Sequence, residues 1–224
     1  KGLHPRRWRL HSKIVITATA VLLVGGTAAF YFLERDGAFA GVPEGQKVLM
    51  AAFQSVTPRT AGFNTVDLMA LSESATLLTM MLMFVGAGSG STGGGIKVNT
   101  FAVLVLETLS QIRRKEDVNV FRRRLDEETI HRAHASVTMY TMACLVGCLV
   151  LCLQGIALED ALYEAISAIG TVGLTRGVTP VLPELSKAVI LLLMFAGRVG
   201  SMSVAMAVTR DHPAPRVRNV PEKI

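Results

Sequence analysis

The segment Thr57-Pro58-Arg59-Thr60-Ala61-Gly62-Phe63-Asn64-Thr65 decides how the rest of the chain is interpreted, because it has a counterpart about 111 residues later. The counterpart is Ile169-Gly170-Thr171-Val172-Gly173-Leu174-Thr175-Arg176, and at this offset the threonine and glycine of the two segments coincide. Each is set in the same order of an apolar span, a short apolar segment, a Thr-x-Gly turn and another apolar span. This internal repeat has the plan of a pore-loop channel subunit.

The composition favours a membrane protein. Half of the 224 residues are hydrophobic and only 18% are charged, whereas a soluble domain is about a quarter charged. Residues 14–32 and 135–153 contain no charge and are close to the ~20 residues that cross a bilayer. Residues 75–96 and 188–197 are also uncharged, and each is followed by one basic residue inside continuing apolar sequence. The first span has no small-residue cleavage site, so it is predicted to be a retained helix.

The distribution of positive charge predicts the topology. The net charge is +6, but sixteen of the 23 lysines and arginines lie within residues 1–13, 113–132 and 210–223. Two long spans separate successive clusters, so all three can face one side, which the positive-inside rule makes the cytoplasm. The prediction is therefore a multi-pass protein with both termini cytoplasmic, and nucleic acid is not an expected partner.

The two turns are candidates for binding a cation through their backbone. Potassium filters use Thr-Val-Gly-like turns whose carbonyls replace the water shell of the ion, and glycine permits the required backbone angles. The segments before the turns, residues 46–56 and 158–168, are too short to cross the membrane and are predicted to be re-entrant pore helices whose carbonyl ends favour cations. Two ordinary surface turns are the alternative. The predicted filter residues are Thr60, Ala61, Gly62, Phe63, Thr171, Val172, Gly173 and Leu174, with potassium held by the backbone of all but Phe63 and Leu174.

A glycine-rich run interrupts the second span of the chain. Residues 86–95 contain six glycines, each costing about 1 kcal/mol relative to alanine in a helix, so the helix is expected to break near the membrane middle. The repeat places Arg198 opposite Ala87, and an intramembrane arginine is a functional-site hypothesis by default. For Arg198 the alternative is a static structural bond, and for the glycine run it is a G-x-x-x-G packing motif. The residues predicted to form a gate are Gly86, Gly88, Gly90, Gly93, Gly94, Gly95, Lys97 and Arg198.

Other chemistries fit the sequence less well. A phosphate-binding loop fails because Ile96 separates Gly95 from Lys97, and Val98 stands where serine or threonine is required. Three cysteines at positions 144, 148 and 152 share one helix face, but no histidine or carboxylate in that span completes a metal site, so a packing face is predicted. No Ser/His/Asp set is visible, and an enzyme is not expected.

At these same residues the sequence resembles the Trk/Ktr/HKT superfamily of potassium transporters. Residues 60–65 are similar to its third filter loop, residues 86–97 to its intramembrane gating loop, and residues 171–174 to its fourth filter loop. Arg198 matches the arginine of the last helix that faces the gate. The connector around residues 118–123 is similar to that of the bacterial Ktr-type membrane pore subunit.

The resemblance implies an all-α membrane fold built from M1–pore helix–M2 repeats, four of which form a pseudo-fourfold pore. It also implies a homodimer of such pores in the bacterial cytoplasmic membrane and a cytosolic RCK-type regulatory ring that binds the nucleotide. Potassium is the implied transported ion, with Na⁺ as a second candidate. The chain holds two repeats, so it is predicted to be the C-terminal half of a longer protein, and a two-repeat dimer is the alternative. A secondary transporter of another solute, with a broken-helix midplane site, is the competing function.

The expected organisation follows the repeat. The third repeat covers residues 1–110, with M1 at about 14–32, pore helix 46–56, filter 57–65 and a broken M2 at 75–109. A charged cytoplasmic connector, residues 111–134, is expected to be either a solvated helix or a docking surface. The fourth repeat covers residues 135–208, with M1 at 135–153, pore helix 158–168, filter 169–176 and M2 at 185–208, and residues 209–224 form the tail.

Overall fold

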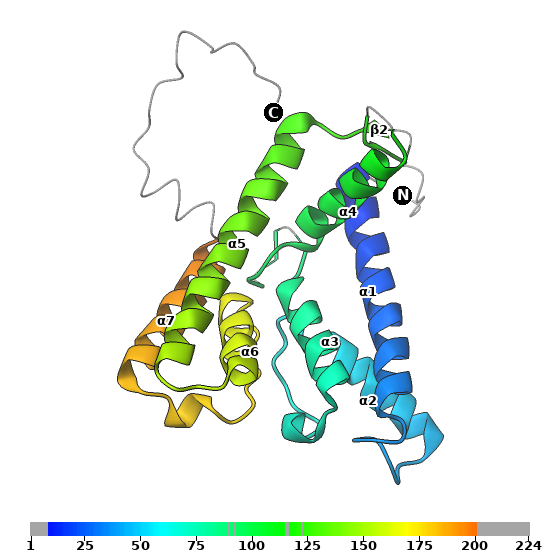
Figure 1. The fold of residues 1–224 in the computed structure, drawn as a ribbon. Helices are drawn as coiled ribbons and strands as arrows, with labels where there is room; N and C mark the ends of the chain where they lie inside the picture. Colours follow the sequence, from blue (N-terminus) through cyan, green and yellow to red (C-terminus); the bar gives the residue numbers. More distant parts are fainter. Residues whose placement is uncertain (1–8, 89, 92, 115–116, 122, 201–224) are drawn as a thin grey trace.

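The structure, a computed structural model, describes residues 9–88, 90–91, 93–114, 117–121 and 123–200. These residues are mainly helical, as predicted, and the two-stranded hairpin β1–β2 is the only sheet among them. Figure 1 shows two groups of helices side by side, α1 to α3 and α5 to α7, with α4 between them. The main hydrophobic core is shared between the two groups, because α3 packs on α6.

Two helices are long and apolar enough to cross a membrane, judged by length and composition within the described residues. Helix α1, Leu10–Glu34, has 25 residues and is therefore about 37 Å long, which exceeds the ~30 Å hydrocarbon core of a bilayer. Helix α5, Glu127–Leu153, has 27 residues. Large apolar side chains project outward from both, among them Val24 (71% exposed) and Leu153 (74% exposed). Such a surface is stable where lipid covers it.

Helix α5 begins earlier than its apolar span. The predicted connector ended at residue 134, but the helix starts at Glu127. Glu127 and Glu128 stand in its first turn, where negative charge is favoured by the helix dipole. The second half of the connector is therefore a charged extension of a membrane-length helix.

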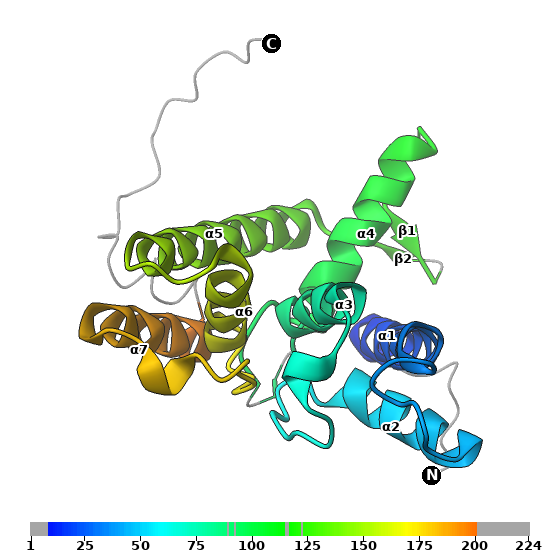
Figure 2. The same cartoon turned by 60° about the horizontal axis from the view of Figure 1, so that its bottom comes forward.

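Two short helices follow the long ones and end near the middle of the molecule. Helix α2, Glu44–Val56, packs on α1, and helix α6, Leu158–Ile169, packs on α5 and α7. Both carry acidic residues in the first turn, which stabilises the N-terminus of a helix. Figure 2 shows α6 between α5 and α3, so the end of α6 lies close to both groups of helices.

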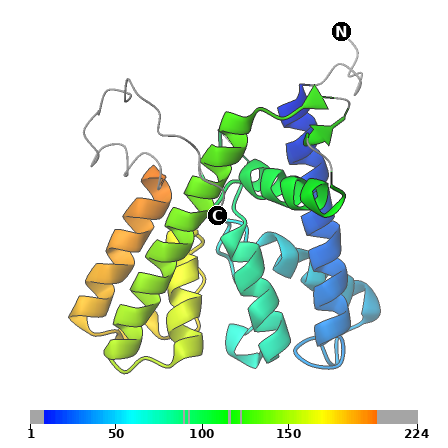
Figure 3. The same cartoon turned by 45° about the horizontal axis from the view of Figure 1, so that its top comes forward.

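The chain leaves the helical conformation between α3, Glu73–Phe84, and α4, Val98–Ile112. Helix α3 is capped by Ser72, whose hydroxyl accepts a hydrogen bond from the Ala75 backbone amide at 3.2 Å. The segment of residues 85–97, of which 89 and 92 lie outside the described residues, is here called the intramembrane loop after its expected position, and it is closed at its base. Val85 and Ile96 form a parallel bridge, and the Gly86 amide donates to the Ile96 carbonyl at 2.8 Å. Figure 3 shows α4 turning away from the axis of α3.

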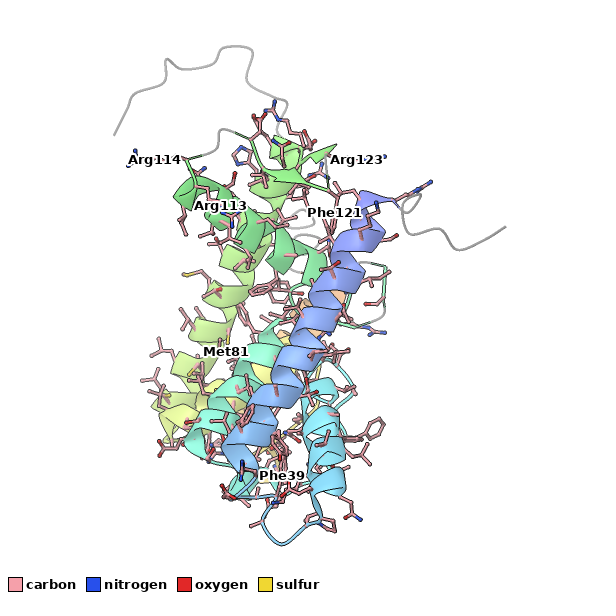
Figure 4. All side chains as sticks on the ribbon, turned by 90° about the vertical axis from the view of Figure 1, so that its right-hand side faces the viewer. Phe39, Met81, Arg113, Arg114, Phe121 and Arg123 are labelled. Atoms are coloured by element: carbon pink, nitrogen blue, oxygen red, sulfur yellow. The ribbon has the colours of Figure 1, made fainter. Side chains whose placement is uncertain are left out.

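The end of the molecule beyond α4 carries the basic connector. Strands β1, Asn119–Val120, and β2, Arg123–Arg124, pair antiparallel, and a small second core lies beneath them. That core consists of Ile14, Val103, Val118, Leu125 and Ala133. Figure 4 shows the labelled Arg113, Arg114, Arg123 and Phe121 together at this end, with Phe39 at the opposite end. The labelled arginines of the connector therefore lie at one end of the molecule.

The last described helix is α7, Glu184–Val199, which follows the 3-10 turn η3, Thr179–Val181. A similar 3-10 turn, η2, Leu68–Ala70, precedes α3. The predicted M2 of residues 185–208 and the tail of residues 209–224 therefore fall partly or wholly outside the described residues, which end at residue 200.

Candidate functional site

Each short helix ends in a turn with the same unusual backbone. Thr60 and Gly62 have φ of 71° and 73°, and Thr171 and Gly173 have φ of 52° and 90°. The residues between them, at positions 61 and 172, do not have positive φ. A left-handed threonine costs roughly 1–2 kcal/mol, and such strained residues cluster at functional sites. The two turns therefore share a strained backbone, because in each of them a threonine, and not only a glycine, has positive φ.

The two turns lie against each other. Gly62 approaches the Val172 carbonyl so closely that an added Cβ would overlap its oxygen. At the corresponding position of the second turn, a Cβ added to Gly173 would have no atom within 4 Å. Gly62 is therefore closely packed and Gly173 is not. A cavity of about 440 Å³ is bordered by residues 171–175. The eight predicted filter residues thus form two turns that are brought together in space.

Buried hydroxyl groups fix the backbone that follows each turn. The Thr57 hydroxyl donates to the Phe63 carbonyl at 2.6 Å and accepts from the Phe63 amide at 2.9 Å. In the second turn, the Ser167 hydroxyl donates to the Leu174 carbonyl at 2.6 Å. Both hydroxyl residues are at most 3% exposed. Sequence reasoning assigned neither of them a role, although a hydroxyl residue near the end of both short helices was a visible signal.

A buried carboxylate anchors the chain beyond the second turn. Glu164, on α6, is 4% exposed. It accepts hydrogen bonds from the hydroxyls of Thr175 and Thr179 and from the Arg176 amide at 3.3 Å. A buried carboxylate is tolerated only when its oxygens are well satisfied, and these donors all come from the segment after the turn. Glu164 was also missed from the sequence, because nothing local marks an isolated glutamate as buried.

The intramembrane loop lies directly against the beginning of both turns. The Gly94 amide donates to Thr171 Oγ1 at 2.8 Å, and a Cβ added to Gly93 would lie 2.7 Å from Thr60 Oγ1. A Cβ added to Gly95 would lie 3.4 Å from Gly170 Cα. Side chains at these positions would push the loop away, so its glycines permit the contact.

The two predicted gate cations lie close to this contact. Lys97 Nζ donates to the Gly93 carbonyl inside the loop, and Arg198 lies within electrostatic reach of Lys97. Arg198 occupies the last turn of α7. The preceding Gly197 brings α7 into backbone contact with Ile169 at the end of α6. Lys97 is thus bound to the loop, and Arg198 lies within electrostatic reach of it.

Two of the predicted gate glycines are not near the turns. Gly88 faces α1, where an added Cβ would lie 3.1 Å from Val15 Cγ1. Gly90 has φ of 85° and no atom within 4 Å of an added Cβ. The predicted gate therefore divides into glycines that contact the turns (Gly93, Gly94, Gly95 and, through Arg59, Gly86), an outer part around Gly88 and Gly90, and the two cations Lys97 and Arg198.

Comparison with known proteins identifies a matching family. The family model named TrkH, described as a cation transport protein, matches residues 3–219. The Ktr system potassium uptake protein B of Vibrio alginolyticus is 38% identical over 218 residues, covering 93% of this chain and 48% of the relative. The potassium/sodium uptake protein NtpJ of Enterococcus hirae is 36% identical over 207 residues, covering 89% of this chain and 46% of the relative.

A solved structure has a similar fold. The crystal structure of the potassium transporter TrkH from Vibrio parahaemolyticus matches with a TM-score of 0.77 and 20% identity, over 89% of this chain and 45% of that chain. At this identity the likeness concerns the fold alone. The chain spans about half the length of these relatives.

Proposed function

Because the chain belongs to the TrkH family of cation transport proteins, we propose that it forms part of a gated, channel-like pore for potassium uptake across the bacterial cytoplasmic membrane. The observation that carries this proposal is the matched backbone of the two turns, with positive φ at Thr60 and Gly62 and again at Thr171 and Gly173. Positive φ at alternate residues sets the direction of the peptide groups in a turn, and glycine permits this conformation. Rows of backbone carbonyls can then replace the water shell of a cation.

The proposed filter consists of the carbonyls of residues 60–62 and 171–173. The carbonyl ends of α2 and α6 immediately precede these turns, and the negative end of a helix dipole would favour a cation there. Potassium is the proposed ion because relatives at 35–38% identity are named potassium uptake proteins. Na⁺ is the second candidate, since one relative is named a potassium/sodium uptake protein.

The intramembrane loop is the proposed gate. It lies against both turns, held by the hydrogen bond from the Gly94 amide to Thr171 Oγ1. A pore that runs past Thr60 and Thr171 would be obstructed by the loop in this position. Lys97 and Arg198 add positive charge near the same place, and this charge opposes the passage of a cation.

Two turns cannot surround an ion that four turns are expected to share. The chain spans about half of its relatives, and we propose that it supplies the third and fourth repeats of a four-repeat pore, with the first two in the rest of the polypeptide. Two such pores would form a homodimer. A cytosolic RCK-type nucleotide-binding ring would contact the basic connector, residues 111–134, and control the gate.

The test is potassium uptake by the full-length polypeptide in cells that lack their own uptake systems. Gly173→Asp is compared with Gly155→Asp, because both glycines have φ near 90° (90° and 86°) and no atom within 4 Å of an added Cβ. The two changes therefore impose the same backbone strain, but only the first places a carboxylate in the proposed filter. The expected result is loss of uptake, or of preference for K⁺ over Na⁺, in Gly173→Asp alone. Equal uptake by both variants at equal membrane amounts would reject the filter and favour a transporter of another kind.

A further inference from the structure

An arginine in the first turn reaches the base of the intramembrane loop. Arg59 immediately precedes Thr60, and its Nη2 donates to the Gly86 carbonyl at 3.3 Å. Gly86 is also the residue whose amide closes the loop by donating to Ile96. One guanidinium group therefore joins the proposed filter to the point where the loop begins.

The environment of Arg59 makes this contact energetically important. Its side chain is partly buried, and among the described residues its buried Nε atom has no hydrogen-bond partner. A guanidinium group stays charged in proteins, and at membrane depth a charge depends on nearby acceptors. The Gly86 carbonyl can act as an acceptor because the helix is broken at this point. Movement of the loop away from the turn would remove that acceptor.

The two turns hold the loop differently. In the repeat, the position of Arg59 is occupied by Gly170 in the second turn, which has no side chain to offer. The second turn instead contacts the loop through Thr171 Oγ1, which accepts from the Gly94 amide at 2.8 Å. The loop is thus held by a cation at Gly86 and by a neutral hydroxyl at Gly94, two loop residues that lie next to each other near its base. Only the first of these contacts involves a formal charge.

We propose that Arg59 is a positioning residue that keeps the intramembrane loop closed against the first turn. This proposal rests on the proposed function of the loop as the gate. Opening the loop would break the contact between Arg59 and the Gly86 carbonyl, and weakening that contact would shift the population toward the open loop. A hydrogen bond from a charged donor is strong enough to change such a population about tenfold.

The experiment measures initial potassium uptake by the full-length polypeptide, expressed without its proposed cytosolic regulator. Arg59→Met removes the donors and the charge, and Arg59→Lys keeps the charge on a group that cannot form the same fork. The expected result is an increase in uptake of up to about tenfold for Arg59→Met and a smaller increase for Arg59→Lys. Arg35→Met is the matched control, because Arg35 is exposed and pairs with its neighbour Asp36.

A second background separates the loop from the filter. Val85 and Ile96 lie side by side as bridge partners, so deletion of residues 86–95 rejoins the backbone over a short gap. Without the loop, uptake should rise, and Arg59→Met should then cause no further change in rate or in K⁺ over Na⁺ preference. A residue that merely supports the turn would alter that preference in both backgrounds.

Three results would overturn the proposal, and they are distinguishable. If the deletion raises uptake but Arg59→Met does not, Arg59 does not hold the loop while the gate assignment stands. If Arg59→Met changes ion preference equally with and without the loop, it acts on the filter. If the deletion does not raise uptake, the loop is not the gate and both proposals fail. Membrane amounts are compared by immunoblot, and if Arg59→Met is not inserted, unchanged uptake in a normally inserted Arg59→Lys is decisive against the proposal.

Discussion

Substitution of Gly62 by alanine tests whether the two turns touch in the working protein. Gly62 has φ of 73°, and its added Cβ would overlap the Val172 carbonyl oxygen. The oxygen belongs to the backbone, so it cannot rotate away as the end of a side chain would. To restore van der Waals contact, the two turns must separate by about 1 Å. Such a displacement would move the carbonyls that are proposed to bind the ion.

The magnitude follows from comparison with Gly173, which has the same kind of backbone conformation but open space around it. Alanine in the left-handed region costs roughly 1–2 kcal/mol, so Gly173→Ala should weaken the apparent affinity for K⁺ about tenfold. Gly62→Ala carries the same strain and an additional overpacking cost of about 1–3 kcal/mol. The difference corresponds to a further loss of about fivefold to a hundredfold.

The assay is the initial uptake rate as a function of external K⁺, in cells without other uptake systems and at matched membrane amounts. Gly155→Ala is the control for strain alone, because its φ is 86° and its surroundings are empty. The expected order of apparent affinity is Gly155→Ala, then Gly173→Ala, then Gly62→Ala as the weakest. Equal effects at Gly62 and Gly173 would refute the contact between the turns. An equal effect at Gly155 would show that general backbone strain is responsible.

Three further changes test the framework around the turns. Thr57→Ala removes both hydrogen bonds to the backbone that follows the first turn. It should destabilise the protein by about 1–3 kcal/mol and lower the discrimination of K⁺ over Na⁺, whereas the control Thr108→Ala, at an exposed hydroxyl, should do neither. Equal melting temperatures of the two variants in detergent would contradict this expectation. Gly197→Ala forces α7 away from the backbone at the end of α6 and should cost about 1–3 kcal/mol, while Gly25→Ala, which meets nothing within 4 Å, should be neutral or stabilising in the same thermal assay. Glu164→Gln replaces one of the two accepting carboxylate oxygens by an amide group, so that a single oxygen remains for the donors that now bind both. This change should lower the melting temperature and reduce uptake by a few-fold. Unchanged values would show that the Glu164 anchor is unnecessary.

The elements themselves were largely predictable from local sequence. A short helix was expected at residues 158–168, and α6 covers Leu158–Ile169, because an apolar segment bounded by turn residues has little freedom in its length. Helix α5 begins at Glu127, eight residues before the apolar span expected at residues 135–153, since apolar character marks the crossing segment and not the charged turns that precede it. Glu127 and Glu128 stabilise the first turn of α5 through the helix dipole. This effect does not depend on hydrophobicity, so the apolar pattern does not reveal it.

The partners of the site were less predictable. Thr57, Ser167 and Glu164 act through hydrogen bonds to residues that are distant from them by six to fifteen positions. The contact between Arg59 and Gly86 spans 27 positions. A hydroxyl or a carboxylate in a sequence does not indicate which donor it will meet, because that depends on how the neighbouring segments pack.

The sequence by itself determined the apolar spans, the two Thr-x-Gly turns and the break at the glycine run, because each depends on residue type and spacing along one segment; the internal repeat added the expectation that Arg198 lies near the break. Only the tertiary structure decided that Gly62 meets the Val172 carbonyl, that Gly94 meets the Thr171 hydroxyl, and that Arg59 reaches the base of the loop. These contacts join segments separated by 27 to 110 positions, and they depend on how the helices pack, including α3 on α6 and α2 on α3. The physical reason is that hydrophobicity and backbone conformational preference are properties of individual residues and their sequence neighbours. The choice of a hydrogen-bond partner depends instead on which distant segments the fold brings within reach.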